Sequence, residues 1–214
     1  MSQDPRSQAQ SQAICRFIRG TPGALYDIGV GPKSEWRSLA LAYPRMRVCG
    51  CEPHPAQYEA LRKAKFAGPL MKVAIGEREG VATLHVPTND LKCCSLLAVP
   101  YANTTCEVDV WTLDRFDRQM GCPDRILLWL DVEGSELSAL RSGPRLLASG
   151  RIRWINLEER RNGHCPAPGW CDPQELHAFL SGHGYVRIAD YNRHPTHQDA
   201  IYAHREEPCS ASSR

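Results

Sequence analysis

Short apolar runs alternate with amphipathic stretches along most of the chain. This alternation is typical of strands and helices that follow one another on a mostly parallel sheet. The expected strands of this sheet are residues 24–28, 47–52, 71–75, 107–111, 126–130 and 152–157. The expected helices begin near Ser34, Pro55, Leu113, Ser135 and Pro173. The pattern therefore predicts an α/β fold of Rossmann-like type, with helices on both faces of a central sheet.

Three segments refine this prediction. The run at 126–130 is apolar throughout, as expected of a central strand that is covered on both faces. The apolar runs at 185–189 and 200–203 are joined by a short connection, which cannot be a parallel crossover, so we expect an antiparallel C-terminal hairpin. Residues 81–86 alternate and predict an extra strand, whereas residues 89–105 lack a period and predict a long loop.

The length of 214 residues favours a single domain. We expect this domain to span residues 13–205, between flexible polar tails at 1–12 and 206–214. No run approaches the roughly 18 apolar residues that a membrane-spanning helix needs. Residues 1–12 also lack the apolar core of a secretory signal. These features predict a cytoplasmic protein with no membrane partner.

The charge balance argues against a nucleic-acid partner. Twenty-six Lys and Arg against 24 Asp and Glu leave a net charge of +2. This is too even for the electrostatic footprint of a protein that binds phosphates along a nucleic acid. A local basic cluster among mixed charges is interpreted as a solvated face: Arg151, Arg153, Arg160 and Arg161. The sequence carries no signal for the oligomeric state.

The chain has ten cysteines, which at this length and without a secretory signal are expected to be free thiols. A zinc site is the alternative, built from His164, Cys165 and Cys171 with the Cys93–Cys94 pair. It is less favoured, because the sequence contains no Cys-x-x-Cys pair. A divalent metal is therefore not supported, and no metal ligand is assigned.

A glycine turn follows the first expected strand. Gly29 and Gly31 lie where strand gives way to helix, and glycines there let the backbone approach a bound ligand. A dinucleotide fingerprint would need a third glycine at position 34, which is Ser34. Asp27 would repel a phosphate but attract an ammonium group. The turn therefore favours a methyl donor, S-adenosylmethionine, over NAD, although a tight turn with a capping Asp remains the structural alternative.

An acid ends the second expected strand. Glu52 stands 21 positions after Gly31, and in open α/β sheets an acid at that place reaches the ribose hydroxyls of a bound nucleotide. Pro53 and Pro55 fix the path of the chain after it. Both NAD and S-adenosylmethionine present such a ribose. Beside the glycine turn, we interpret Glu52 as a cofactor contact rather than an ordinary surface carboxylate.

Further carboxylates follow the most apolar strand. Asp131 emerges at the carboxyl edge of the sheet, where folds of this kind bind ligands. We expect it to act as a general base or as the ligand of a divalent ion. Glu158 or Glu159, at the end of the next strand, is expected to be the second carboxylate. Ser135 and Glu136 are also explained by capping of the following helix.

The acceptor is expected to be chosen by the two least periodic regions, residues 89–105 and 160–172. His194, His197 and Asp199 precede the last expected strand. They are more readily explained as a turn and a strand entrance, with a lining of the acceptor pocket as the alternative.

Five strings in this order resemble the FkbM-type methyltransferase family: YDIGVG at 26–31, CEP at 51–53, VAIG at 73–76, TLD at 112–114 and LDVEGSEL at 130–137. The resemblance covers about residues 24–160, and its most specific part is the last string with TLD upstream. It implies a class I S-adenosylmethionine fold that often acts on a hydroxyl of a sugar or natural product. Two positions depart from the family pattern: Gly31-Pro32, where Asn is often present, and Trp129, where Lys often stands.

These observations predict an S-adenosylmethionine-dependent methyltransferase that methylates a hydroxyl on a small molecule or glycan by in-line transfer. The expected catalytic residues are Asp131 and Glu158. The expected cofactor-binding residues are Asp27, Gly29, Gly31, Glu52, Pro53, Ala74, Ile75 and Asp131. The alternatives are an NAD-dependent oxidoreductase of Rossmann type and a catalytically silent nucleoside-binding or interaction module.

Overall fold

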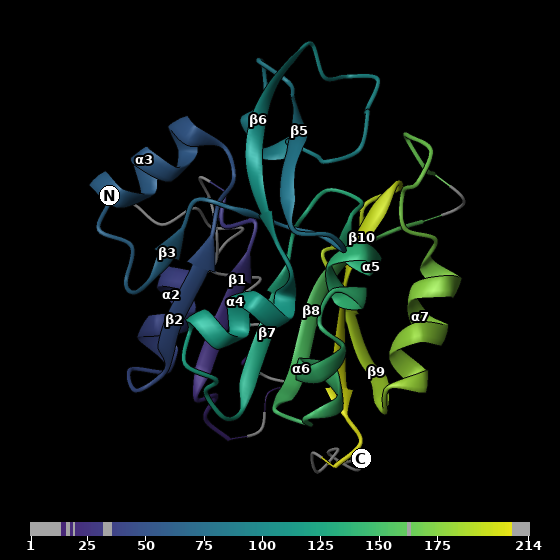
Figure 1. Ribbon diagram of the computed structural model, residues 1–214. Coiled ribbons are helices and arrows are strands. Elements are labelled where there is room, and N and C mark those ends of the chain that lie inside the picture. Colours follow the sequence, from purple (N-terminus) through teal and green to yellow (C-terminus); the bar gives the residue numbers. More distant parts are fainter. Residues whose placement is uncertain (1–13, 16–17, 19, 32–35, 162–163, 207–214) are drawn as a thin grey trace.

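A computed structural model describes residues 14–15, 18, 20–31, 36–161 and 164–206 (Figure 1). The helix cap expected at Ser34 lies outside these residues, as do the tail residues 1–12 and 207–214. Within the described residues the strands form one seven-stranded and one three-stranded sheet. No helix in this part of the chain is long and apolar enough to span a bilayer.

The larger sheet has the strand order β3-β2-β1-β7-β8-β10-β9. Its strands are β1 (Ala24–Ile28), β2 (Arg47–Cys51), β3 (Leu70–Met71), β7 (Ile126–Leu130), β8 (Ile152–Arg160), β9 (Tyr185–Tyr191) and β10 (His197–His204). Within this sheet, β3, β2, β1, β7 and β8 are parallel to one another, and β10 is antiparallel to both of its neighbours, β8 and β9. The mostly parallel sheet and the C-terminal antiparallel hairpin are thereby confirmed.

Helices cover both faces of this sheet, as predicted (Figure 1). One face packs against α2 (Trp36–Ala42) and α3 (Pro55–Lys63), and the other against α4 (Leu113–Gln119), α5 (Glu136–Arg141), α6 (Pro144–Ala148) and α7 (Pro173–Gly182). Strand β7 shows why its run is apolar throughout. Leu128 and Leu130 face the cluster under α4 to α7, whereas Leu127 and Trp129 face the opposite cluster.

The prediction of a single strand at residues 71–75 is wrong. Met71 ends β3 in the larger sheet, and the chain then enters β4 (Ala74–Ile75), which belongs to the smaller sheet. The smaller sheet has the order β4-β6-β5, with β5 at Gly80–Val86 and β6 at Thr104–Trp111. The segment is mostly apolar, but its two halves pair with different strands, β2 and β6. A hydrophobic pattern alone does not specify a strand's partner.

The extra strand predicted at 81–86 is present as part of β5, and the aperiodic region after it is mostly loop. Only a short 3-10 helix, η1 (Leu91–Cys93), interrupts it before β6 begins at Thr104. Strands β5 and β6 extend beyond the larger sheet in Figure 1. The segment between them, residues 90–101, is called the roof segment below.

Polar contacts fix several element ends. Thr112 caps α4 through its hydroxyl, which accepts from the backbone N–H of Arg115 at 3.2 Å. Asp172 caps α7 by accepting from the N–H groups of Gln174 and Glu175 at 2.8 and 3.0 Å. Both caps follow the side-chain preferences of helix N-termini, from which these two helix starts were predicted.

A buried carboxylate links α4 to two strands. The Tyr26 hydroxyl of β1 donates to Asp117 Oδ1 at 2.8 Å. Arg151, just before β8, donates to both oxygens of Asp117 at 3.0 and 2.5 Å. Asp117 is only 4% exposed, so the charge of its carboxylate depends on these donors for compensation.

Replacing this carboxylate should destabilise the fold. Asp117→Ala leaves the guanidinium of Arg151 and the hydroxyl of Tyr26 without their partner, and we expect the free energy of unfolding to fall by about 3 kcal/mol. Urea denaturation followed by circular dichroism measures this. The matched control is Arg62→Gln, which removes an ion pair with Glu59 on the exposed surface of α3 and should change stability by less than about 0.5 kcal/mol. Equal effects of the two substitutions would contradict this account.

Candidate active site

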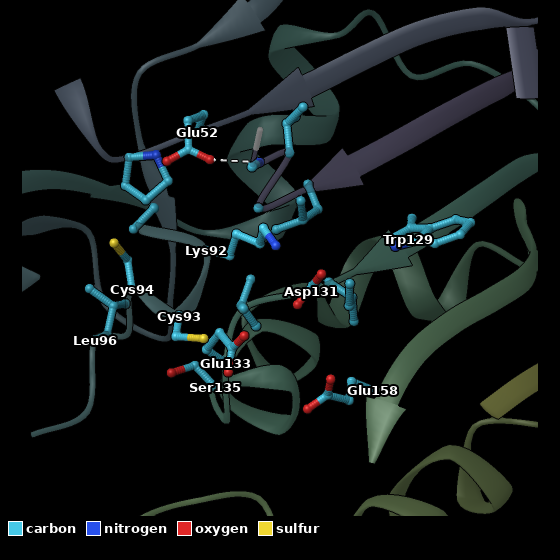
Figure 2. Close-up of a pocket in the computed structure, with 18 of the residues that line it drawn as sticks. Glu52, Lys92, Cys93, Cys94, Leu96, Trp129, Asp131, Glu133, Ser135 and Glu158 are labelled. Carbon is cyan, nitrogen blue, oxygen red and sulfur yellow. Dashed lines mark hydrogen bonds between the residues drawn. The ribbon is translucent and has the colours of Figure 1, made fainter. Parts of the chain in front are cut away.

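A cavity of about 790 Å³ lies at the carboxyl ends of β1, β2, β7 and β8. The glycine turn, Glu52, the β7 carboxylates and the roof segment surround it (Figure 2). Every residue expected to bind the cofactor or to act in catalysis lines it: Asp27, Gly29, Gly31, Glu52, Pro53, Ala74, Ile75, Asp131 and Glu158. The fold therefore brings together residues that are up to 131 positions apart in sequence, from Asp27 to Glu158.

The glycine turn touches the end of β7. The backbone N–H of Asp131 donates to the carbonyl of Ile28 at 3.0 Å. Gly29 has a φ of +83°, and a Cβ there would lie 2.0 Å from the Asp131 carbonyl oxygen. Any side chain at position 29 would separate β1 from β7. Gly31 differs, because among the described residues a Cβ there would meet nothing closer than 3.9 Å, which leaves space beside it on the cavity wall.

Glu52 is tied to the glycine turn. Its Oε2 accepts from the backbone N–H of Gly31 at 2.8 Å, as the dashed line in Figure 2 marks. Its Oε1 accepts from the N–H of His54, also at 2.8 Å. Burial raises the pKa of this carboxyl to about 7, against the opposing effect of the two N–H donors. The carboxylate is thus held at the cavity wall with lone pairs to spare.

Carboxylates crowd the deep end of the cavity. Asp131 stays accessible to water inside the cavity, but the surrounding protein and then the charges of Glu158 and Asp199 hold its pKa well above the usual range. Burial and the charge of Glu133 raise the pKa of Glu158 to about 8. Burial and Asp131 raise the pKa of Glu133 to about 8 as well. Such a group of carboxyls holds protons near neutral pH.

Arg160 offsets part of this charge. Its Nη2 lies 3.3 Å from Glu133 Oε2 and 3.2 Å from Glu158 Oε1. The guanidinium stacks over the Trp170 ring, 4.5 Å from its centroid. The interpretation of Arg160 as part of a solvated face is therefore wrong. A charge count along the sequence could not show that this arginine turns inward.

Glu159 does not line the cavity, unlike its neighbour Glu158. It accepts from the Tyr202 hydroxyl at 2.8 Å and pairs with Arg187 at 2.8 Å, among residues on the other face of the sheet. Successive side chains of a strand point to opposite faces, which explains the division. Of the two glutamates offered by the sequence, only Glu158 lines the cavity.

Glu136 has a structural partner. Its Oε1 accepts from the backbone N–H of Gly134 at 3.1 Å and of Val132 at 3.4 Å. Ser135 is the N-cap residue of α5 but makes no side-chain cap bond. Glu136 therefore stabilises the turn between Asp131 and α5.

The roof segment closes the cavity on one side. Ser95 Oγ donates to the carbonyl of Glu133 at 2.8 Å, and Gln57 of α3 donates to the carbonyl of Leu91. Lys92 and Cys93 extend from η1 into the cavity in Figure 2. The absence of a period in residues 89–105 indicated a loop of this kind, but nothing local identified the residues that line the site.

The opposite wall comes from the turn between β9 and β10. His194 and His197 line the cavity, with ring centroids 4.5 Å apart, and Asn192 donates to Asp199 at 2.9 Å. His194, His197 and Asp199 therefore line the cavity, and they also form the turn and the start of β10 that the sequence indicated. Within its described residues, the expected acceptor region 160–172 contributes only Arg160 to the lining.

Trp170, from the same region, packs against the turn after β7. A Cβ on Gly134 would lie 2.4 Å from its ring.

The zinc alternative gains no support: Cys171 is buried in the core, while His164 and Cys165 are exposed. Among the described residues, no group of three or more His, Cys, Asp or Glu is arranged to hold a metal ion. The cysteines of this part of the chain are free thiols.

Solved structures show which fold this is. An FkbM methyltransferase from Methylobacillus flagellatus KT matches with a TM-score of 0.55 and 17% identity, over 87% of this chain and 45% of that one. The chain thus spans about half the length of that protein. A putative tRNA (m1A22) methyltransferase, Sp1610 of Streptococcus pneumoniae, matches with a TM-score of 0.51 and 11% identity, over 97% and 73% of the two chains. At such identities the likeness shows the fold alone, which is that of class I methyltransferases.

The sequence comparisons identify the family. None of the curated proteins compared with the chain matches it. A family model described as the FkbM methyltransferase domain matches residues 27–187, which is most of the chain. The match confirms the resemblance and includes the glycine turn, Glu52, Asp131 and Glu158. The chain belongs to the FkbM family of S-adenosylmethionine-dependent methyltransferases.

Proposed function

We propose that the protein transfers a methyl group from S-adenosylmethionine to a hydroxyl of a small molecule or glycan. One observation carries the proposal: a single cavity is lined at one end by the glycine turn and Glu52, and at the other by Asp131 and Glu158. The first end suits an adenosyl cofactor, and the second suits an acceptor that must lose a proton. Family membership supports methyl transfer over the oxidoreductase alternative.

The residues present fit the cofactor. Glu52 offers carboxylate lone pairs to ribose hydroxyls, and the open space beside Gly31 admits a ligand close to the backbone. Asp27 offers a negative charge for the amino-acid ammonium group. Val73, Ile75, Leu91 and Leu96 provide apolar lining for a base. When bound, S-adenosylmethionine supplies a methyl group on a cationic sulfur, an excellent leaving group.

The chain's own residues then position the acceptor and take its proton. Asp131 is the proposed general base, because its carboxyl lines the cavity and a raised pKa makes its carboxylate a stronger proton acceptor. Glu158 is the proposed second carboxylate, which accepts a hydrogen bond from the acceptor. Arg160 holds Glu158 in place through its 3.2 Å contact. The roof segment and the β9–β10 turn limit the entry of water.

Ligand-induced stabilisation tests the cofactor assignment. S-adenosylhomocysteine at a hundredfold excess over its dissociation constant should stabilise the folded protein by about 2.7 kcal/mol, because it binds the native state alone. The stabilisation is measured by thermal melting, with NAD at the same concentration as the control. Stabilisation by NAD alone would favour the oxidoreductase, and no response to either ligand would contradict the proposal.

Asp131→Asn tests the base. The substitution keeps the size of the side chain but removes its capacity to accept the proton, so we expect turnover to fall at least about 100-fold. The measurement is transfer of labelled methyl groups to components of an extract, followed by mass spectrometry of the products. S-adenosylhomocysteine binding, measured by calorimetry, should persist.

The matched control for this test is Glu159→Gln. It removes a carboxylate on the other face of the sheet and should leave turnover of the folded protein intact. Undiminished turnover in Asp131→Asn would exclude Asp131 as the base.

The crowded carboxyls should make stability depend on pH. The folded-state pKa values of Glu133 and Glu158, about 8, lie above the value of about 4.3 for an unfolded chain. The folded state therefore holds more protons, and this contribution to stability, complete below pH 4, is lost as the pH rises to about 8. We expect urea denaturation of the ligand-free protein to show this fall. Glu158→Gln should make it shallower, and an unchanged slope would contradict the assigned crowding.

A further inference from the structure

Gln57 presents a buried acceptor to the cavity. Its side chain is 5% exposed, and it projects from α3 into the lining beside the glycine turn. Its Oε1 has no hydrogen-bond partner among the described residues. A buried carbonyl oxygen without a donor is unfavourable, and such an atom in a ligand cavity indicates a donor that the ligand brings.

The orientation of this amide is fixed by its other end. Nε2 donates to the carbonyl of Leu91 and lies 3.9 Å from the Cys94 sulfur. Turning the amide over would bring Oε1 against the Leu91 carbonyl, which offers no donor. Gln57 therefore directs an acceptor, and not a donor, toward the glycine turn.

The acceptor lies beside the position of Glu52. A Cβ on Gly31 would be 3.9 Å from Gln57 Oε1, and no other described side chain comes closer to it. The N–H of the same Gly31 donates to Glu52 Oε2 at 2.8 Å. Two side-chain acceptors, one charged and one neutral, thus converge on the open space at Gly31. A vicinal diol carries two adjacent O–H donors, which match this pair of acceptors. A cationic ammonium group is better matched by the negative charge of Asp27.

We propose that Gln57 is a specificity residue for the ribose of the cofactor, where its Oε1 accepts a hydrogen bond from one of the two ribose hydroxyls while Glu52 accepts from the other. The inference rests on the proposed use of S-adenosylmethionine. A residue of α3 would then contact the ribose directly. The same side-chain amide would bind the roof segment through its nitrogen and the ligand through its oxygen.

Calorimetric titration with S-adenosylhomocysteine and its 2′-deoxy and 3′-deoxy analogues tests the assignment. In the wild type, one analogue should bind more weakly than the parent through loss of the bond to Gln57. In Gln57→Leu that discrimination should shrink about three- to tenfold, the equivalent of one hydrogen bond. In Gln57→Glu, which keeps an acceptor oxygen, the discrimination should remain. Gln174→Leu, on the exposed surface of α7, is the matched control and should leave all three affinities unchanged.

The outcomes separate this inference from the proposed function. If Gln57→Leu weakens the parent and both analogues by the same factor, or weakens none, Gln57 does not contact the ribose and the inference is overturned. If the wild type does not bind S-adenosylhomocysteine at all, the proposed function itself fails. Because the readout is a ratio of affinities within one variant, a general loosening of the roof segment cancels from it.

Discussion

The site depends on a backbone contact between the ends of β1 and β7. The chain reverses its direction of progress across the sheet between these two strands, and ligands of such folds bind at that place. Here the Asp131 N–H donates to Ile28, and the Cα of Gly29 lies so close to the Asp131 carbonyl that no Cβ fits between them. This contact sets the separation between the glycine turn and Asp131 in the cavity wall.

The second constraint is charge. Asp27, Glu52, Asp131, Glu133 and Glu158 line one cavity in a chain whose net charge is only +2. Arg160 offsets part of this negative charge through its ion pairs with Glu133 and Glu158. The raised pKa values of these two carboxyls reduce the charge further, because they favour the protonated form. A cationic donor entering the site relieves the remaining repulsion, so the same carboxylates that are unfavourable in the empty cavity favour binding. An even overall composition conceals this local imbalance, because composition averages over the whole surface.

Predictions from the sequence succeeded where the signal was local. The apolar run of β7, the glycines after β1 and the caps at Thr112 and Asp172 each encode their structure within a few residues. Such local signals led to the fold, and the strand ends that they mark carry Gly29, Gly31 and Asp131 of the cavity lining. Arg160 and Gln57 were missed because their roles come from contacts with residues 27 to 37 positions away. The split between β3 and β4 was missed for the same reason, since strand partners are nonlocal.

The smaller sheet gives the roof segment a hydrophobic core of its own. Strands β5 and β6 carry the roof segment on a framework whose core of Leu84, Val86, Val108 and Val110 is distinct from the two clusters of the larger sheet. Residues of the roof segment can therefore change without disturbing the packing that holds Glu52 and Asp131. Such an arrangement lets side chains of the roof segment vary on a stable framework, and it gives an engineer a segment to exchange as a unit.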